Sequence, residues 1–501
     1  MRKSVFLLCL FSITLLFLGW RNYWSPAITA DGYTNMSCFM KSWNEHGLAA
    51  CKGAPCYTFG APGDRFLPYF PGPIDESGKC YYTSFPPFSF ILTYYYLKAV
   101  PFVPQQTALL WLNLILQLAV ALLVMLLTRF LLRKAGNFSA NISALSSYSL
   151  ILFTPISFHF FTTYYFIENG ALVFWCLATY AGLLYFNSLQ SKTHITRIRV
   201  FFLCSLALLC YTELIGYFLA AALMVVIYLK ANTIENYKKE LAAILGVTLF
   251  IALVTFLQYS SINGTAAFLF HIKTRLVGRS GWFGESYSES GMSWYSLALY
   301  KNAWALLQHG FLPLLLLLIA YTGSISIRKG ESTWKHFDIA TAELLLLVVP
   351  YGLHTLLFIN ANLLHEQLIV KAIVPLSVLC GVRIAKLNFQ NERWFTRGNL
   401  LLVLALLISA LQTSFLFLEL PFETEQQKIG AEIKNKIRPT QTPVLKVNTL
   451  QHDFGPNLFY YSGRNIALVK DNAALDLISS KIPSDSLVVW QLDEDWKIKT
   501  H

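Results

Sequence analysis

Charged residues are scarce in this sequence. Asp, Glu, Lys and Arg make up 13% of the 501 residues, whereas hydrophobic residues make up 55% and aromatic residues 15%. This composition excludes an ordinary soluble globular protein and predicts an α-helical polytopic membrane protein. Acidic residues are the rarer sign, 27 against 39 Lys and Arg. Because basic residues retain cytoplasmic loops, the excess does not indicate nucleic-acid binding.

Several sequence signals are also missing. No small-residue cleavage site follows the first apolar segment, so we expect residues 4–20 to form an uncleaved first span with a cytoplasmic N-terminus. We find no metal-ligand histidine pair and no phosphate-cradling glycine loop, and therefore predict no cofactor and no protein-bound metal. A divalent ion held by Asp31 and a substrate phosphate would leave no motif. The lack of an internal repeat disfavours an inverted-repeat transporter.

Apolar segments of about 20 residues predict about eleven transmembrane helices. The short inner connections are basic, and the odd number of spans places the C-terminal tail outside. The apolar run 200–230 is too long for one span, so we divide it at Tyr211–Thr212–Glu213. Glu213 there fits either an outer turn or a polar lining group. The predicted spans are roughly 4–20, 106–128, 143–161, 167–187, 200–213, 214–230, 241–260, 304–325, 338–358, 368–385 and 398–420.

The first outer loop, roughly residues 21–86, is too long for a simple connector. Within it, residues 31–46 have the pattern of an amphipathic helix that ends at Gly47. The apolar segment 88–103 is short and bounded by prolines, which favours a helix in the membrane interface. Four cysteines in an outer loop indicate an oxidising compartment and predict two disulfides with three possible pairings; unpaired thiols are the alternative. These cysteines are Cys38, Cys51, Cys56 and Cys80.

Asp31 lies just beyond the first predicted span. Trp20, Tyr23 and Trp24 come before it and are typical of the lipid headgroup level. Asp31 is therefore expected just outside the bilayer, at the depth where a lipid-linked substrate presents its phosphate. An alternative role for Asp31 is to cap the helix that follows it.

The order of features along the chain is more specific than any single motif. An acid after the first span is followed by a helix ending in Asn44–Gly47, and then by Tyr81–Phe88, which contains Pro86–Pro87. This order resembles the GT-C glycosyltransferases, and most of all the bacterial branch that shares its pattern with protein O-mannosyltransferases and the aminoarabinose transferase of lipid A. His365–Leu368, followed by Lys371 and Pro375, is similar to that branch's His-acid-aromatic motif.

The resemblance covers roughly residues 1–420, and the sequence departs from it in three places. Gly32 follows Asp31 where the family often has Glu, Phe85 precedes Pro86–Pro87 where it often has His, and Gln367 stands where it commonly has an aromatic residue. The resemblance implies a multi-pass plasma-membrane enzyme. Such an enzyme takes a sugar from a polyprenyl-phosphate donor and passes it to a glycan, lipid or protein acceptor on the outer face.

The expected chemistry needs one base and a group of cations. Asp31 would accept the proton of the acceptor hydroxyl in a single inverting displacement. Cations would receive the departing phosphate, and the second large outer loop, roughly 261–303, carries three basic residues. A solvated loop or a contact with anionic headgroups is the alternative for each. The predicted phosphate-binding residues are Lys273, Arg275, Arg279 and Lys371.

Four further residues are predicted to bind substrate: Tyr33, Glu168, His365 and Glu366. Glu168 alternatively caps the following helix, and Glu366 alternatively forms a structural pair with Lys371. A transporter or flippase for a lipid-linked or small polar substrate is the second functional hypothesis. The enzyme is favoured because the candidate residues gather at one membrane surface, whereas transporters bind near the midplane.

Residues 421–501 have a mixed polar and apolar composition that differs from the predicted transmembrane domain, 1–420. Segments 442–450, 466–470 and 486–492 are predicted strands, and 423–438 and 472–482 are predicted helices. We therefore expect a small α/β domain on the outer face.

Overall fold

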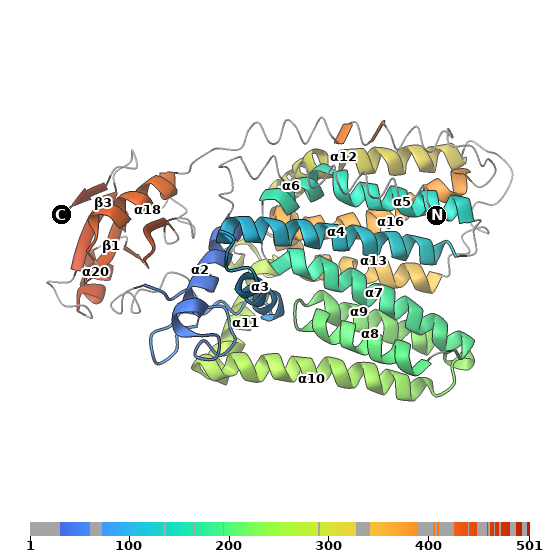
Figure 1. Cartoon of the computed structure of the whole chain (residues 1–501), viewed down its shortest axis with the longest axis horizontal. Coiled ribbons are helices and arrows are strands. Elements are labelled where there is room, and N and C mark those ends of the chain that lie inside the picture. Colours follow the sequence, from blue (N-terminus) through green and yellow to red (C-terminus); the bar gives the residue numbers. More distant parts are fainter. Residues whose placement is uncertain are drawn as a thin grey trace.

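The computed structural model describes residues 31–60, 73–133, 137–163, 167–193, 195–288, 291–326, 341–388, 404–405, 408–409, 425–438, 440–447, 458, 461–464, 466–469, 472–480, 487–492 and 498–500. These residues form a bundle of helices and a separate small sheet (Figure 1). The predicted span 4–20 and most of 398–420 lie outside the described residues.

Among the described residues, three helices are long and apolar enough to cross a membrane: α4 (Gln105–Leu131), α7 (Ile167–Ser191) and α10 (Tyr237–Asn263). Two bent pairs bring the number to five if each pair is one span. One pair is α5 (Asn137–Phe153) with α6 (Pro155–Thr163), and the other is formed by the halves of α12 (Leu297–Ser326).

The structure does not show the eleven predicted spans. Helices α8 (Ile195–Cys210), α9 (Ile215–Leu229) and α13 (Thr341–Leu357) are each shorter than 18 residues. The predicted span 143–161 is interrupted where α5 gives way to Pro155, because proline starts a new helix more readily than it continues one. The predicted division of 200–230 is confirmed, since α8 and α9 are separate helices.

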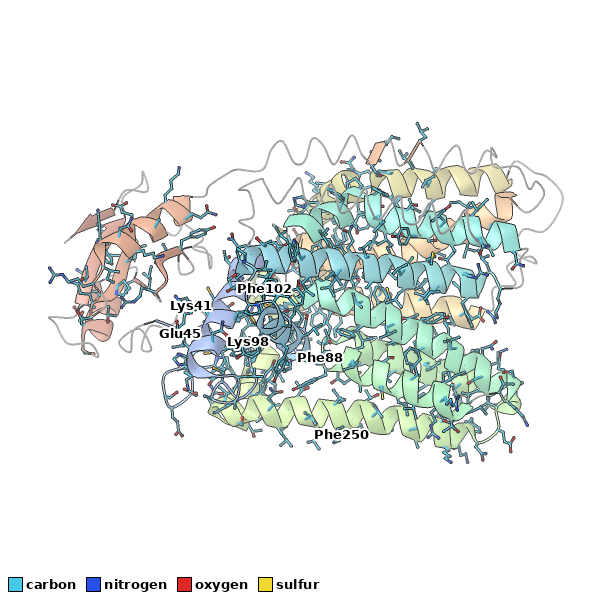
Figure 2. All side chains as sticks on the ribbon, viewed as in Figure 1. Lys41, Glu45, Phe88, Lys98, Phe102 and Phe250 are labelled. Atoms are coloured by element: carbon cyan, nitrogen blue, oxygen red, sulfur yellow. The ribbon has the colours of Figure 1, made fainter. Side chains whose placement is uncertain are left out.

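Packing in the bundle pairs α4 with α5 and α7, and α16 (Ile373–Asn388) with α5 and α12. The long helices lie side by side in Figure 1. Helix α10 is the least buried of the three long helices. Its Phe250 is 63% exposed and projects away from the other helices (Figure 2). An apolar face of this kind is suited to lipid.

Three short helices gather at one end of the bundle: α2 (Asp31–His46), α3 (Phe88–Ala99) and α11 (Thr265–Ser280) (Figure 1). The amphipathic helix predicted for 31–46 is confirmed. Its apolar side is fully buried, including Met36, Phe39 and Trp43. The Trp43 indole donates to the carbonyl of Ala54 at 2.9 Å, and Gly47 ends the helix with φ +88°. The described parts of the first loop, 31–60 and 73–86, therefore pack around this helix.

The two disulfides predicted for the first loop are not present. Cys38, Cys51, Cys56 and Cys80 are buried thiols in the structure. Aromatic contacts pack the loop instead: the centre of the Phe39 ring lies 4.6 Å from that of Tyr57, 5.7 Å from that of Tyr82 and 5.4 Å from that of Phe90. Burial raises the pKa of Cys38 to about 12, although the charge of Lys41 acts to lower it. A thiol in these surroundings behaves as a small apolar side chain.

The C-terminal part contains a four-stranded sheet in the order β2-β1-β3-β4. Strand β1 (Thr442–Val447) is parallel to β2 (Ala467–Val469) and β3 (Leu487–Leu492), and β4 (Ile498–Thr500) is antiparallel to β3. Helices α18 (Glu425–Lys436) and α20 (Asn472–Ser479) accompany it. Three strands and both helices occur where the sequence predicts them, whereas β4 was not predicted.

The sheet region contacts the first loop through α2. The Lys41 ammonium donates to the carbonyl of Gly463 at 2.8 Å, and it lies 4.5 Å from the centre of the Phe59 ring. Lys41 and Glu45 lie on the side of α2 that faces the sheet (Figure 2). The C-terminal part is thus attached at the same end of the bundle as α2, α3 and α11 (Figure 1).

Candidate functional site

A cavity of about 250 Å³ opens at this end of the bundle. Its walls come from the turn Thr83–Pro86, the break before α9, the end of α10, and α11, α13 and α14 (Ile359–Leu364). Most of the wall is apolar, with Phe268, Leu276 and Leu357 among the lining side chains. The polar exceptions are few and chemically distinctive, and they determine what the cavity can bind.

Arg275 and Arg279 project from α11 into the cavity wall. They are four residues apart and therefore share one face of the helix. Glycines set the limits of this helix: Gly264 (φ +92°) separates it from α10, and Gly281 (φ +65°) ends it in the left-handed conformation. The Arg279 guanidinium also lies 5.2 Å from the centre of the Phe85 ring.

Lys273 is on the same helix but does not line the cavity. Its side chain is exposed. Of the three basic residues predicted on this segment, the structure thus places two in the cavity wall and one outside it.

A buried ion pair joins Glu213 to Lys371 beside the cavity. Glu213 lies in the break between α8 and α9, and Lys371 lies in the short 3₁₀ turn Val370–Ala372 that precedes α16. Each side chain is 1% exposed. The Lys371 ammonium donates to Oε1 of Glu213. The alternative partner of Lys371, the side chain of Glu366, lies outside the described residues.

His354, on α13, also reaches Glu213. Its Nε2 lies 3.3 Å from Glu213 Oε1, and the Asn362 amide nitrogen lies 3.5 Å from its Nδ1. If Nδ1 accepts from the amide, Nε2 carries the proton and donates to the carboxylate, so the network favours one tautomer. Side chains from two other elements, Lys371 and His354, thus converge on one oxygen of the Glu213 carboxylate.

The other oxygen of Glu213, Oε2, has no hydrogen-bond partner among the described residues, although it is buried. An unmet buried polar atom costs about 1–3 kcal/mol, and more when the group is charged. Because Glu213 lines the cavity, a ligand in the cavity can supply the missing donor. Unmet atoms of this kind are expected where a site binds its substrate.

Glu168 lies in the same electrostatic neighbourhood. It is in the first turn of α7 and 2% exposed, and it interacts with the charges of Lys371, Glu213 and Arg279. Its Oε2 also has no hydrogen-bond partner in the part of the chain that the structure describes. The predicted substrate residue Glu168 is therefore close to the cavity's charged groups. It is the second residue of α7, and its alternative role as a helix cap stays a prediction.

Tyr82, in the first loop, lies near the same charged groups. Burial raises the pKa of its hydroxyl, and the charges of Arg279, Glu168 and Arg275 act on it as well. The Tyr259 hydroxyl, on α10, donates to the carbonyl of Phe85. This hydrogen bond joins the first loop to α10 at the cavity wall.

The other predicted site residues have mixed positions. Helix α2 begins at Asp31, but the side chain of Asp31 lies outside the described residues. Tyr33 is 1% exposed and accepts a hydrogen bond from the Asn113 amide at 3.4 Å. His365 is exposed, between α14 and α15 (Glu366–Ile369). The side chain of Glu366 is outside the described part.

Sequence reasoning did not assign a site role to His354 or Tyr259. For Glu213 it left two alternatives, an outer turn or a polar lining group, and the structure places Glu213 both in the break between α8 and α9 and in the cavity wall. His354 had a usable signal, because an ionisable residue inside a predicted apolar span, 338–358, is by default a functional candidate. Tyr259 had none, since tyrosine is common at membrane interfaces. Among the described residues, no group of three or more His, Cys, Asp and Glu side chains could hold a metal ion.

Comparisons with known proteins give structural matches only. No protein-family model and no curated protein matches the chain. A crystal structure of ArnT from Cupriavidus metallidurans bound to undecaprenyl phosphate matches with a TM-score of 0.55 and 12% identity, covering 98% of this chain and 93% of that one. The oligosaccharyltransferase of Archaeoglobus fulgidus in the apo form matches with a TM-score of 0.57 and 13% identity, covering 97% and 69%.

A third match is the archaeal oligosaccharyltransferase AglB from Archaeoglobus fulgidus, in complex with an inhibitory peptide and a dolichol-phosphate. Its TM-score is 0.56 at 12% identity, and it covers 98% of this chain and 69% of that chain. The chain has the GT-C fold. At this identity the likeness establishes the fold and leaves residue roles to the geometry of the site. In this GT-C fold, the Arg275–Arg279 cavity opens at the end that carries the first loop.

Proposed function

We propose that this protein is a membrane glycosyltransferase that moves a sugar from a polyprenyl-phosphate donor to an acceptor hydroxyl on the outer face of the membrane. One observation carries the proposal: in a GT-C fold, a largely apolar cavity has two arginines in its wall and a buried carboxylate beside them. A ligand with an apolar tail, a phosphate and a hydroxyl-bearing head matches the apolar wall, the arginines and the carboxylate in turn.

The phosphate is assigned to Arg275 and Arg279. A guanidinium presents a fork of donors that fits phosphate oxygens, and it keeps its charge at all physiological pH values. The apolar wall beside them suits the isoprenoid chain. Two of the matched structures contain lipid phosphates, undecaprenyl phosphate in ArnT and dolichol-phosphate in AglB. These ligands support a polyprenyl-phosphate donor here.

Asp31 is proposed as the base. It accepts the proton of the acceptor hydroxyl while the hydroxyl oxygen forms a bond to the anomeric carbon. The bond between that carbon and the phosphate oxygen breaks in the same step, so the configuration is inverted. The phosphate leaves with the bonding electrons, and Arg275 and Arg279 stabilise its charge. Lipid phosphate is a good leaving group, and no separate proton donor is needed.

The test is the variant Asp31→Asn in the full-length protein. Turnover of a panel of undecaprenyl-phosphate sugars, with membranes as acceptor, should fall by about 10²–10⁴ because a general base contributes that much. Binding of undecaprenyl phosphate should stay within about threefold of wild type, since Asn keeps the size of the side chain and the cavity arginines remain. Glu76→Gln, at an exposed acid in the same loop, is the matched control.

Two results would contradict the proposal in different ways. Near wild-type turnover by the Asp31→Asn variant would remove Asp31 as the base. Movement of the intact lipid-linked sugar across the membrane, with no sugar transferred, would replace the enzyme by a flippase.

A further inference from the structure

The two oxygens of the Glu213 carboxylate have different surroundings. Lys371 and His354 both approach Oε1. Oε2 is left without a partner among the described residues, although the side chain is only 1% exposed. Glu213 also lines the cavity that contains Arg275 and Arg279. One oxygen is therefore used to fix the carboxylate, and the other remains available to a ligand.

The charges around Glu213 specify what that ligand group must be. Lys371 already compensates the charge of Glu213, and Glu168 adds a second buried carboxyl group nearby. A phosphate placed at Glu213 would bring a second negative charge next to the carboxylate, and it would offer Oε2 no hydrogen-bond donor. A neutral group that donates hydrogen bonds satisfies Oε2 and adds no charge.

The cavity therefore has an anion-binding part at the arginines and a donor-binding part at Glu213. A glycosyl phosphate has the same two parts in direct succession, because its sugar hydroxyls lie next to the phosphate. We infer that Glu213 recognises the donor sugar, with Oε2 accepting a hydrogen bond from a ring hydroxyl and with Lys371 and His354 holding the carboxylate in position. This inference rests on the proposed function and names the group that selects the sugar.

The expected consequence is discrimination between sugars with and without that hydroxyl. A site built to bond a hydroxyl rejects the analogue that lacks it, because the buried acceptor is then left unmet. Arg275 and Arg279 contact only the phosphate in this scheme, so they do not contribute to this discrimination.

The experiment compares binding of undecaprenyl phosphate alone with binding of undecaprenyl phosphate that carries glucose, mannose or galactose. The best of these sugars should bind wild type more tightly than the bare lipid phosphate. In Glu213→Gln the gain in affinity that the sugar provides should shrink about tenfold or more. This variant should also bind a donor that lacks one sugar hydroxyl as tightly as the complete donor. Binding of bare undecaprenyl phosphate should stay within about threefold of wild type.

Glu213→Gln leaves Lys371 without its counter-ion and can prevent folding for that reason alone. The double variant Glu213→Gln, Lys371→Met removes both charges and is measured in parallel. Glu240→Gln is the matched control: Glu240 is buried, pairs with Arg199 at 3.2 Å, and does not line the cavity. Its sugar-dependent gain should equal that of wild type.

The outcomes separate this inference from the proposed function. If wild type shows a sugar-dependent gain that both Glu213 variants keep, Glu213 is not the sugar-binding residue. If wild type binds the bare lipid phosphate but gains nothing from any sugar, the sugar subsite is wrong and the lipid-phosphate cavity stands. If wild type binds neither ligand, the proposed function fails as well.

Discussion

The basic residues of α11 differ in which face of the helix they occupy. Arg275 and Arg279 line the cavity, whereas Lys273 is exposed outside it. Replacing either arginine by Gln should weaken binding of undecaprenyl phosphate by about tenfold, because one charge-assisted contact is lost. Lys273→Gln, which makes the same change in charge on the same helix, should weaken it by less than about threefold.

Equilibrium binding of fluorescent undecaprenyl phosphate to protein in nanodiscs measures all three variants. Arg279→Lys should recover only part of the affinity, since an ammonium lacks the fork of donors. Equal losses for Lys273 and the arginines would mean that overall charge, and not the cavity, governs binding.

Residue spacing predicted the arginine pair but could not predict the partner of Lys371. Glu366 is near it in sequence, and was the natural candidate. The observed partner, Glu213, is 158 residues away. Such a pair depends on how α9, α13 and α16 pack, and that packing leaves no periodic trace in the sequence of any one helix.

At the level of elements, local patterns were the reliable guide. The amphipathic period of α2, the prolines around α3 and the apolar runs of β1 and β3 predicted helices and strands where the structure has them, because these signals are local. That α3 lies in the membrane interface stays a prediction. Span counting was less successful. Length and hydropathy do not reveal that the predicted span 143–161 bends at Pro155, because a proline inside an apolar run breaks the helix without changing the length of the run.

The first loop is fastened to the end of α10, and this contact can be tested. Lys52 donates to the carbonyl of Ser261 at 2.5 Å, and the Gln258 amide donates back to the Lys52 carbonyl at 3.0 Å. Positive charge at a helix C-terminus is favourable. Lys52→Met should therefore lower the free energy of unfolding by about 1 kcal/mol, measured by SDS titration in mixed micelles.

Lys238→Met is the control, because Lys238 is an exposed lysine at the other end of α10. It should change the free energy of unfolding by no more than a few tenths of a kcal/mol. An equal loss in both variants would show that the Lys52 contact to α10 contributes nothing specific.

At the scale of the whole molecule, the two ends of the bundle differ in chemistry. The first loop, α11 and the C-terminal sheet lie at one end (Figure 1). Basic connections lie at the other: Arg133 at the end of α4 pairs with Glu343 of α13 at 2.6 Å, and Lys192 pairs with Glu235 at 2.9 Å. Basic loops are retained in the cytoplasm, so the cavity end is predicted to face outward.

Cysteine labelling in intact cells tests this orientation. A membrane-impermeant maleimide should label Glu76→Cys and Lys273→Cys at the cavity end, and should label Lys192→Cys and Lys238→Cys only after permeabilisation. The exposed native Cys204 is first replaced by Ser to lower the background. The reverse pattern would place the arginines of α11 in the cytoplasm, where a donor carried on the outer leaflet could not reach them. Sugar transfer would then have to occur on the inner face, because α11 and the first loop lie at the same end of the bundle (Figure 1) and must therefore be on the same side of the membrane.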